Sequence, residues 1–443
     1  MKLSDTDTYS DNNGSNSLTP FLLITACFIL WGFANNVTTP LVGAYAKIFN
    51  ISITKATLVP FVCSLGYFCL ALLAAFFIQR FSLKWGLLTG LALYAVGALL
   101  FLPASAIGAF FPFLIAYFVL AGGLSFLETC CNPYVYCHGD RQTAIQRLNA
   151  AQSFNALGAV VAMFVAMFVH SQMSEADSLA RSQMPVQQFN IIKDHDLDIL
   201  IQPYFYVAAI VVLVLVTLWL SHLPHTDMPD SKKGPVEAIT QLLTRKNYRE
   251  GVIAEFCYIG AQAGCWMFIS YYGTRIFVAE GMTEQAAEVT AQKYNILAMV
   301  FFAGSRFVCT WLLRRFSPER MLTVAAILGM TALIGVILFT DRSGIYCLVA
   351  VSACLSLMFP TIYGLALRNI DEDVKTAGAG LVMAIIGGAV IPPLQAVILQ
   401  SDVTLLGLPG TNLSYLIPFA CLAMVAWYGH RAYVRHTIQG TEE

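Results

Sequence analysis

The stretch QRFSLKWGL (residues 79–87) has a counterpart in RRFSPERML (residues 314–322). In both places a long apolar segment ends in basic residues and a short turn follows. The two stretches lie 235 residues apart, and the same separation holds for Trp31 and Trp266. A constant offset of this size predicts an internal duplication, in which the segments around each stretch follow the same order in both halves of the chain.

The composition indicates a membrane protein. Of the 443 residues, 58% are hydrophobic and 12% are charged, and the mean hydropathy is +0.68. A soluble domain usually contains about 25% charged residues. The formal net charge is −1 and no basic run stands out, so we expect no nucleic-acid partner.

The number of apolar segments predicts an all-α membrane protein with twelve transmembrane helices. A helix needs roughly 20 apolar residues to cross a bilayer. The segments that meet this requirement are 20–46, 57–79, 85–105, 108–136, 148–170, 201–221, 252–277, 291–313, 321–340, 344–367, 376–399 and 413–434. With the duplication, they form two six-helix bundles.

The polar stretches between the spans predict how the chain is divided. We expect a flexible tail at 1–18, a first bundle at 19–221, a linker at 222–250, a second bundle at 251–435 and a tail at 436–443. Both tails and the linker should be cytoplasmic, because 17 of the 25 Lys and Arg residues then lie inside and 7 lie outside.

Several polar side chains lie deep within the predicted spans, where an unpaired polar group costs several kcal/mol. Glu128 and Asn132 are four residues apart and share one face of the fourth span. The seventh span carries a similar stripe of Tyr258, Gln262 and Trp266. The other spans contribute Asn35, Asn36, Thr39, Gln152, Asn155 and Arg306. We expect these side chains to face one another or a water-filled cavity between the bundles.

This combination of side chains suits a sugar. Amides donate and accept hydrogen bonds, as sugar hydroxyls require, and aromatic rings offer flat apolar faces to the C–H side. Two other interpretations remain open: amides also join membrane helices, and Arg306 can snorkel or pair with Glu128. Glu255 and the segment 171–199 are both predicted to be solvated.

An enzyme is disfavoured, because all seven histidines lie at or beyond the predicted span ends. The twelve cysteines fall almost wholly within apolar segments, as buried small hydrophobic residues do. We therefore expect no metal and no cofactor.

Seven stretches resemble one known family. They are LWGFANNVTTPLV (30–42), FLETCCNPYV (126–135), RLNAAQSFNALGAVVA (147–162), EFCYIGAQAGCW (255–266), SRFVCTWLLRRF (305–316), FPTIYGLALRNI (359–370) and MAIIGGAVIPP (383–393). Through them the chain resembles the fucose:proton symporter family of the major facilitator superfamily. The resemblance implies two bundles around a central cavity, alternating access, and uptake of a deoxyhexose or hexose driven by protons. It also implies a multi-pass protein of the bacterial inner membrane that works as a monomer.

The family's motifs assign roles to individual residues. The acid of the L-E-T-x-x-N-P motif is linked to proton coupling, and here it is Glu128, followed by Asn132. The amides of the fifth and seventh helices correspond to Gln152, Asn155 and Gln262. The resemblance thus points to these residues as the proton and sugar sites.

The first span departs from the family pattern. L-fucose permeases typically carry an aspartate in the stretch that reads ANNVTT here, and this chain has no acid there. A symporter that relies on Glu128 alone, a uniporter, an exchanger and a non-transporting sugar sensor all remain open. The glycine-rich stretch GAGLVMAIIGGAVIPP (378–393) is predicted to bend or slide during alternating access, because glycines permit close helix contact and proline interrupts the backbone ladder.

Overall fold

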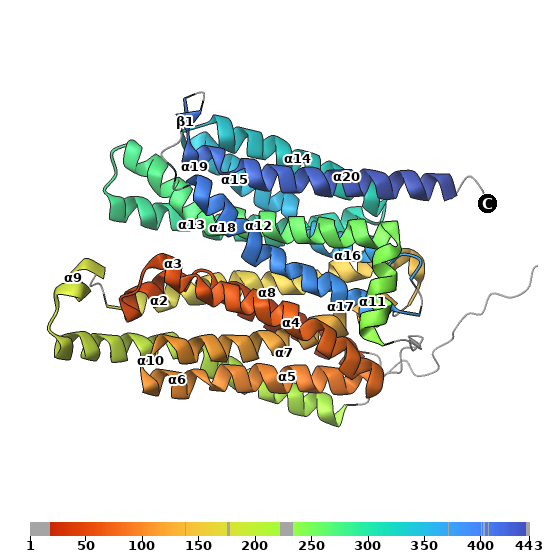
Figure 1. The fold of residues 1–443 in the computed structure, drawn as a ribbon, viewed down its shortest axis with the longest axis horizontal. Coiled ribbons are helices and arrows are strands. Elements are labelled where there is room, and N and C mark those ends of the chain that lie inside the picture. The colour runs from red at the N-terminus through yellow and green to blue at the C-terminus, as the bar shows by residue number, and fades with distance from the viewer. Residues whose placement is uncertain are drawn as a thin grey trace, which may run out of the picture.

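The chain forms two groups of helices that run roughly along the long axis of the molecule (Figure 1). This computed structural model describes residues 18–137, 139–174, 178–221, 234–370, 372–399, 401, 404–405 and 407–439. The first half, red to yellow-green, lies below the second half, green to blue, in Figure 1. Helix α11 lies crosswise at the end near the C-terminus, which we call the termini end.

The first half consists of six long helical units with short helices between them. The bounds are α1 (Leu18–Thr38), α2 (Val42–Phe49), α3 (Ile53–Ala56), α4 (Leu58–Arg80), α5 (Leu83–Leu99), α6 (Phe101–Ile107), α7 (Phe110–Cys137), η1 (Arg141–Thr143), α8 (Ala144–Gln172), α9 (Ser178–Gln183) and α10 (Val186–Leu220).

The second half repeats this order after a connecting helix. The bounds are α11 (Pro235–Thr244), α12 (Lys246–Ala279), α13 (Glu284–Leu312), α14 (Pro318–Leu338), α15 (Arg342–Leu355), α16 (Met358–Leu367), α17 (Val374–Met383), η2 (Ala384–Ile386), α18 (Gly387–Leu399), α19 (Gly410–Leu413) and α20 (Leu416–Gln439). A two-residue hairpin of β1 (Thr404–Leu405) and β2 (Leu408–Pro409) precedes α19.

The helices match the predicted membrane spans. Within the described residues, 11 helices are long and apolar enough to cross a membrane, and Leu23–Thr38 is a shorter apolar helix. The two related stretches lie at equivalent turns, since α4 ends at Arg80 before α5, and α13 ends at Leu312 before α14. The prediction of an all-α protein built from two six-helix halves is confirmed.

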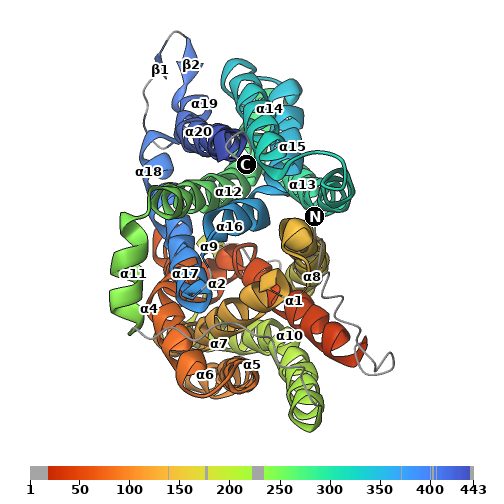
Figure 2. The same ribbon diagram turned by 90° about the vertical axis from the view of Figure 1, so that its right-hand side faces the viewer.

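The two halves meet along a few helices near the centre of the molecule. Viewed along the helix axes, α8 of the first half faces α13 and α16, and α17 lies beside α4 (Figure 2). Helix α11 packs against α4 and α17 and therefore bridges the halves at the termini end.

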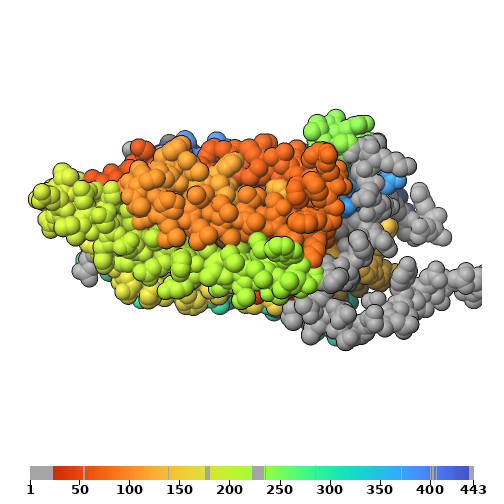
Figure 3. All heavy atoms as spheres, turned by 90° about the horizontal axis from the view of Figure 1, so that it is seen from below, coloured from red at the N-terminus to blue at the C-terminus, as the bar shows by residue number. Residues whose placement is uncertain are grey.

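The outer surface of each half is apolar, as contact with lipid requires. The face built mainly by α5, α6 and α10 is shown in Figure 3. Large hydrophobic side chains are exposed along these helices, including Val96, Ile107, Phe205, Leu213 and Trp219. An exposed surface of this kind would be a liability in water, and it supports the membrane assignment.

Several spans of the described chain are interrupted, among them the first and the eleventh. The first breaks at residues 39–41, between α1 and α2, where Pro40 stands. The eleventh consists of α17, the 3₁₀ turn η2 and α18, and α18 contains Pro392 and Pro393. The interruption coincides with the glycine-rich stretch predicted to bend, while its movement stays a prediction.

The segment 171–199, predicted to be solvated, is exposed at most of its described positions but contains one buried ion pair. This segment contains α9 and the first turns of α10. Within it, the Arg181 guanidinium and the Asp196 carboxylate form an ion pair of 2.5 Å, and both side chains are fully buried. The backbone N–H of Ser174 also donates to Asp196, at 2.9 Å. The two charges are removed from water together because each neutralises the other.

The linker predicted at 222–250 is partly helical. Residues 234–250 include α11 and the start of α12, which begins at Lys246. Positions 222–233, and the predicted tails at 1–17 and 440–443, lie outside the described residues.

The close approach of α18 to α12 leads to a stability prediction. A methyl group at Gly387 would lie 2.9 Å from the carbonyl carbon of Phe256, and that backbone cannot move aside as a flexible side chain can. We expect Gly387→Ala to cost about 1–3 kcal/mol of stability. The measurement is thermal unfolding of the purified protein in detergent.

Gly304→Ala is the matched control, because nothing lies within 4 Å of a methyl group at this helical position. There alanine should stabilise the helix by up to about 1 kcal/mol. Equal melting temperatures for the two variants would contradict the packing argument.

Candidate functional site

A cavity of about 160 Å³ lies between the two halves. Its walls come from α1, α4, α7 and α8 of the first half, and from α12, α13, α16, η2 and α18 of the second. Ten of the residues predicted from the sequence line it: Asn35, Asn36, Thr39, Glu128, Gln152, Asn155, Tyr258, Gln262, Trp266 and Arg306. The structure therefore brings together side chains from five spans that are far apart in the sequence.

Glu128 forms the acidic part of the wall. It lies nine residues before the end of α7 at Cys137, or about 13.5 Å along the helix at 1.5 Å per residue. Its side chain is 4% exposed, and Tyr67 and Asn132 lie next to the carboxyl group. Gln152 Nε2 donates to Asn132 Oδ1 at 3.0 Å. Asn132 thus stands behind the cavity wall and connects Glu128 with the amide of α8.

The aromatic part of the first half is Trp31 of α1. Its indole N–H points to the amide of Asn155 on α8, which also lies 3.2 Å from the backbone N–H of Gly32. With its oxygen toward both donors, the Asn155 amide accepts two hydrogen bonds and holds the Trp31 ring in place. Asn36 Nδ2 donates to Gly32 O at 2.8 Å, and Asn35 is exposed.

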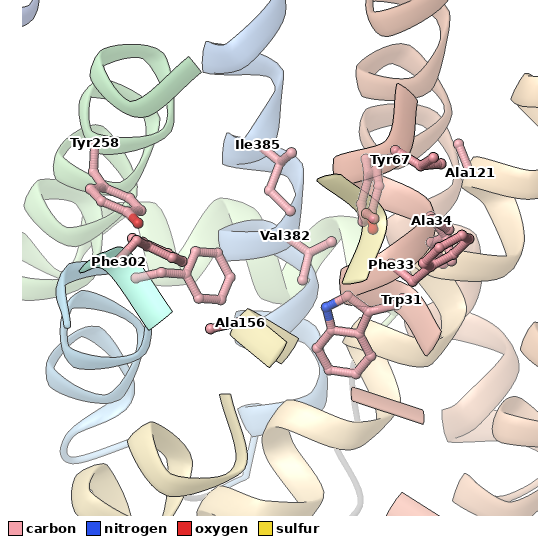
Figure 4. Packing of buried hydrophobic residues seen from close by; sticks show 14 of the residues in the cluster. Trp31, Phe33, Ala34, Tyr67, Ala121, Ala156, Tyr258, Phe302, Val382 and Ile385 are labelled. Carbon is pink, nitrogen blue, oxygen red and sulfur yellow. The ribbon is translucent and has the colours of Figure 1, made fainter. Parts of the chain in front are cut away.

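The stripe on α12 forms the facing wall. Gln262 Nε2 donates to Tyr258 Oη at 2.6 Å, and Trp266 Nε1 donates to Ser352 Oγ at 3.2 Å. The Trp266 ring stands edge-on to Phe302, with 4.9 Å between the ring centroids. In Figure 4, Tyr258 and Phe302 lie across from Trp31, with Ile385 between the two sides. Two aromatic walls with amides at their edges therefore face one another.

Arg306 supplies the positive charge of the cavity. The side chain is 2% exposed and its guanidinium lies 4.5 Å from the centroid of the Phe302 ring. Its Nε donates to Ser356 O at 2.6 Å and its Nη1 donates to Gln152 O at 3.0 Å. These bonds are to backbone carbonyls, and among the described residues Arg306 and Glu128 form no ion pair in this conformation.

The cavity is closed toward the termini end. There Asn149 Nδ2 donates to Thr361 Oγ1 at 3.2 Å, and Gln79 Nε2 donates to Thr376 Oγ1 at 2.6 Å. Both bonds join one half to the other. At the opposite end the lining extends to Pro40 and Pro60, where α1 ends and α4 begins. The cavity is therefore closed near the termini end and extends toward the opposite end.

Sequence reasoning missed some of the lining residues. Phe302, Phe359 and Ser64 also face the cavity. Phe302 stands four residues before Arg306 on one helix face, and this spacing was the available signal. No sequence signal pointed to Ser64, because many serines in apolar helices bond only to the backbone of their own helix.

The prediction that Glu255 is solvated is wrong. Its side chain is 0% exposed, although it lies only nine residues from the start of α12 at Lys246. Helices packed around α12 cover this position. Sequence alone missed the burial because proximity to a helix end was taken as proximity to water.

The sequence model of the Major Facilitator Superfamily matches residues 23–392. The "L-fucose-proton symporter" of Haemophilus influenzae is 40% identical over 423 residues, which is 94% of this chain and 97% of that protein. The "Glucose/galactose transporter" of Brucella abortus is 28% identical over 425 residues, or 96% of each chain.

A solved structure has the same arrangement of helices. The crystal structure of the major facilitator transporter FucP in the outward conformation superposes with a TM-score of 0.80 and 30% identity, over 93% of this chain and 98% of that one. Together with the duplicated halves and the central cavity, these similarities assign the family. The chain belongs to the Major Facilitator Superfamily and, within it, to the family of the fucose–proton symporters.

Proposed function

We propose that the protein imports a monosaccharide, L-fucose or a related hexose or deoxyhexose, together with protons by alternating access. The observation that carries the proposal is the position of Glu128, a buried carboxyl group in a cavity otherwise lined largely by amides and aromatic rings. The chain is 40% identical to a named L-fucose–proton symporter, which supports the same substrate class.

The sugar lies between the two aromatic walls. Trp31 and Trp266 offer apolar faces to its C–H side. The amides of Asn35, Gln152 and Gln262 reach its hydroxyl groups from three different helices. Because these groups sit on both halves, a bound sugar contacts both bundles and its release depends on their relative movement.

The proton is carried by Glu128. Burial favours the neutral carboxylic acid, which donates a hydrogen bond to the sugar or to a neighbouring amide. When the halves rock, the bonds from Asn149 to Thr361 and from Gln79 to Thr376 break and the termini end opens. Glu128 then loses its proton toward this end, nearby positive charge such as Arg306 favours the anion, and both the proton and the sugar leave.

The orientation follows from charge. We place the termini end in the cytoplasm of a bacterial inner membrane, because the sequence predicts 17 of the 25 Lys and Arg residues on that side. The protein works as a monomer, since one chain supplies both walls of the cavity.

One alternative is another hexose as substrate, which the similarity to a glucose/galactose transporter favours. Another is movement of sugar without protons, as a uniporter or exchanger, because the first span has no acid. A thermal-shift screen against a panel of monosaccharides identifies the ligand, since a ligand that binds the folded state stabilises it. Accumulation of that sugar in vesicles separates a transporter from a sensor.

The first prediction concerns the sugar site. Gln262→Ala removes an amide of the cavity wall and leaves a sugar hydroxyl unpaired. We expect the free energy of sugar binding to become about 1–3 kcal/mol less favourable. This change raises the dissociation constant of the sugar about 5- to 150-fold. The measurement is isothermal titration with the sugar from the screen. Gln172→Ala, at an exposed position, is the control. If the double variant Gln262→Ala, Trp266→Ala bound the sugar with wild-type affinity, α12 would not form part of the sugar site.

The second prediction concerns proton coupling. One proton driven by a potential of about 100 mV provides about 2.3 kcal/mol, enough for about 50-fold accumulation of sugar. Glu128→Gln mimics the neutral acid, so it should keep sugar binding and counterflow exchange but lose uphill accumulation. Sugar-dependent alkalinisation outside the vesicles should appear in the wild type and vanish in the variant.

Glu237→Gln, which removes an exposed acid on α11, is the control and should behave as the wild type does. Transport by the wild type without a proton signal would identify a facilitator. Uphill accumulation by Glu128→Gln would assign proton transport to another residue.

A further inference from the structure

Glu255 is a buried acid that the sugar site does not use. It does not line the cavity, and neither carboxyl oxygen has a hydrogen-bond partner among the described residues. Buried carboxyl groups are normally paired, because the desolvation of a polar group is costly without a partner. A group left in this state at the interface of several helices requires an explanation.

The surroundings of Glu255 connect it to Glu128. The two carboxyl groups are close enough to interact electrostatically, so charge on one disfavours charge on the other. Tyr363 of α16 interacts with both of them. Its hydroxyl group is also buried without a partner in the described part of the chain. Tyr363 therefore lies within electrostatic reach of both acids.

On its other side Glu255 connects with the termini end. Tyr428 of α20 interacts with Glu255 and with Arg435, and its buried hydroxyl is likewise unpaired within the described residues. Arg435 forms an ion pair with Glu250, which also pairs with Arg431 at 3.1 Å. The two arginines are partly exposed although Glu250 is buried, so the series of polar groups ends near water.

The titratable and charged groups around Glu255 are few. They are Glu128 from α7, Tyr363 from α16, Tyr428 from α20 and Tyr258 from its own helix, with Arg306 of α13 acting on Tyr258. Among the groups acting directly on Glu255, only Glu128 is another acid and none is a cation. Among the described residues, no cation forms an ion pair with Glu255 in this conformation.

We propose that Glu255 is a second proton-carrying group, which takes the coupled proton from Glu128 and delivers it to the termini end. The inference rests on the proposed function, since it describes the route of the symported proton. When the termini end opens, Glu255 releases its proton to water there. The carboxyl group of Glu128 then gives its proton to the Glu255 carboxylate, and Glu128 is reprotonated from the cavity when the conformation reverts.

This route supplies a second acid in a chain that has none in its first span. The positions of the two acids agree with these different roles. Glu128 faces the sugar cavity, whereas Glu255 lies outside it, among residues that reach the termini end. A proton that moves through Glu255 reaches the termini end along these side chains, apart from the sugar cavity.

The test uses the full-length protein in vesicles under an imposed membrane potential. Glu255→Gln keeps the size and neutral form of the side chain but cannot release a proton. Sugar counterflow should continue. The ratio of internal to external sugar should fall by about 50-fold, which is the accumulation that one proton can drive at a potential of about 100 mV. Glu255→Asp should restore coupling with a shifted pH profile. Wild-type accumulation and proton uptake in Glu255→Gln would overturn the inference.

Glu250→Gln is the matched control, five residues away on the same helix and ion-paired. It should lower thermal stability and leave the number of protons moved per sugar unchanged. A lower number in Glu250→Gln would overturn a specific role for Glu255. The wild type separates the hypothesis of proton symport from the hypothesis of a role for Glu255. If the wild type shows no sugar-dependent proton uptake, the proposed symport itself is wrong.

A measurement on the wild type covers the case in which Glu255→Gln does not fold. A hydrophobic carbodiimide reacts with protonated carboxyl groups, and mass spectrometry locates the label. Labelling of Glu255 should decrease as the pH rises and should change when sugar is added. Labelling that is constant under both changes would mean a permanently protonated structural group and would overturn the inference.

Discussion

The low dielectric of the membrane interior is the constraint on which this structure depends, because every polar group within it needs a partner or a wet cavity. The two halves satisfy this requirement jointly. Near the termini end, Asn149 pairs with Thr361 and Gln79 pairs with Thr376 across the interface. Toward the opposite end the amides and aromatic rings surround open space. Pairing in one region and a cavity in the other define a conformation that is closed at the termini end.

Close packing of small residues makes room for these contacts within each half. A methyl group at Gly158 of α8 would meet the backbone of Ile29 on α1, so these helices touch through their backbones. The result is a rigid bundle in which Trp31 and Asn155 hold fixed positions. The proposed conformational change would act on contacts between the halves, such as the bonds from Asn149 to Thr361 and from Gln79 to Thr376, and on the interrupted eleventh span.

Three buried carboxyl groups meet this constraint in different ways. Asp196 is ionised beside a buried arginine, and both charges are satisfied together. Glu128 stands at a cavity wall with an amide and a tyrosine beside it. Glu255 is enclosed without a hydrogen-bond partner in the described residues. The first arrangement is structural, because the two buried charges pair with each other. The other two are suited to proton exchange, because neither is held in one state by a neighbouring cation.

The sequence by itself determined the membrane class, the duplicated order of helices and most of the polar residues around the cavity, because hydropathy and helical spacing depend on local pattern. Tyr258, Gln262 and Trp266 could be placed on one face from their spacing alone. Only the tertiary structure decided that Asn132 stands behind the wall, that Phe302 and Ser64 belong to it, and that Arg306 bonds to backbone carbonyls. It also decided the burial of Glu255 and Asp196, since the water available to a side chain depends on which neighbouring helices cover it, and those helices come from distant parts of the chain.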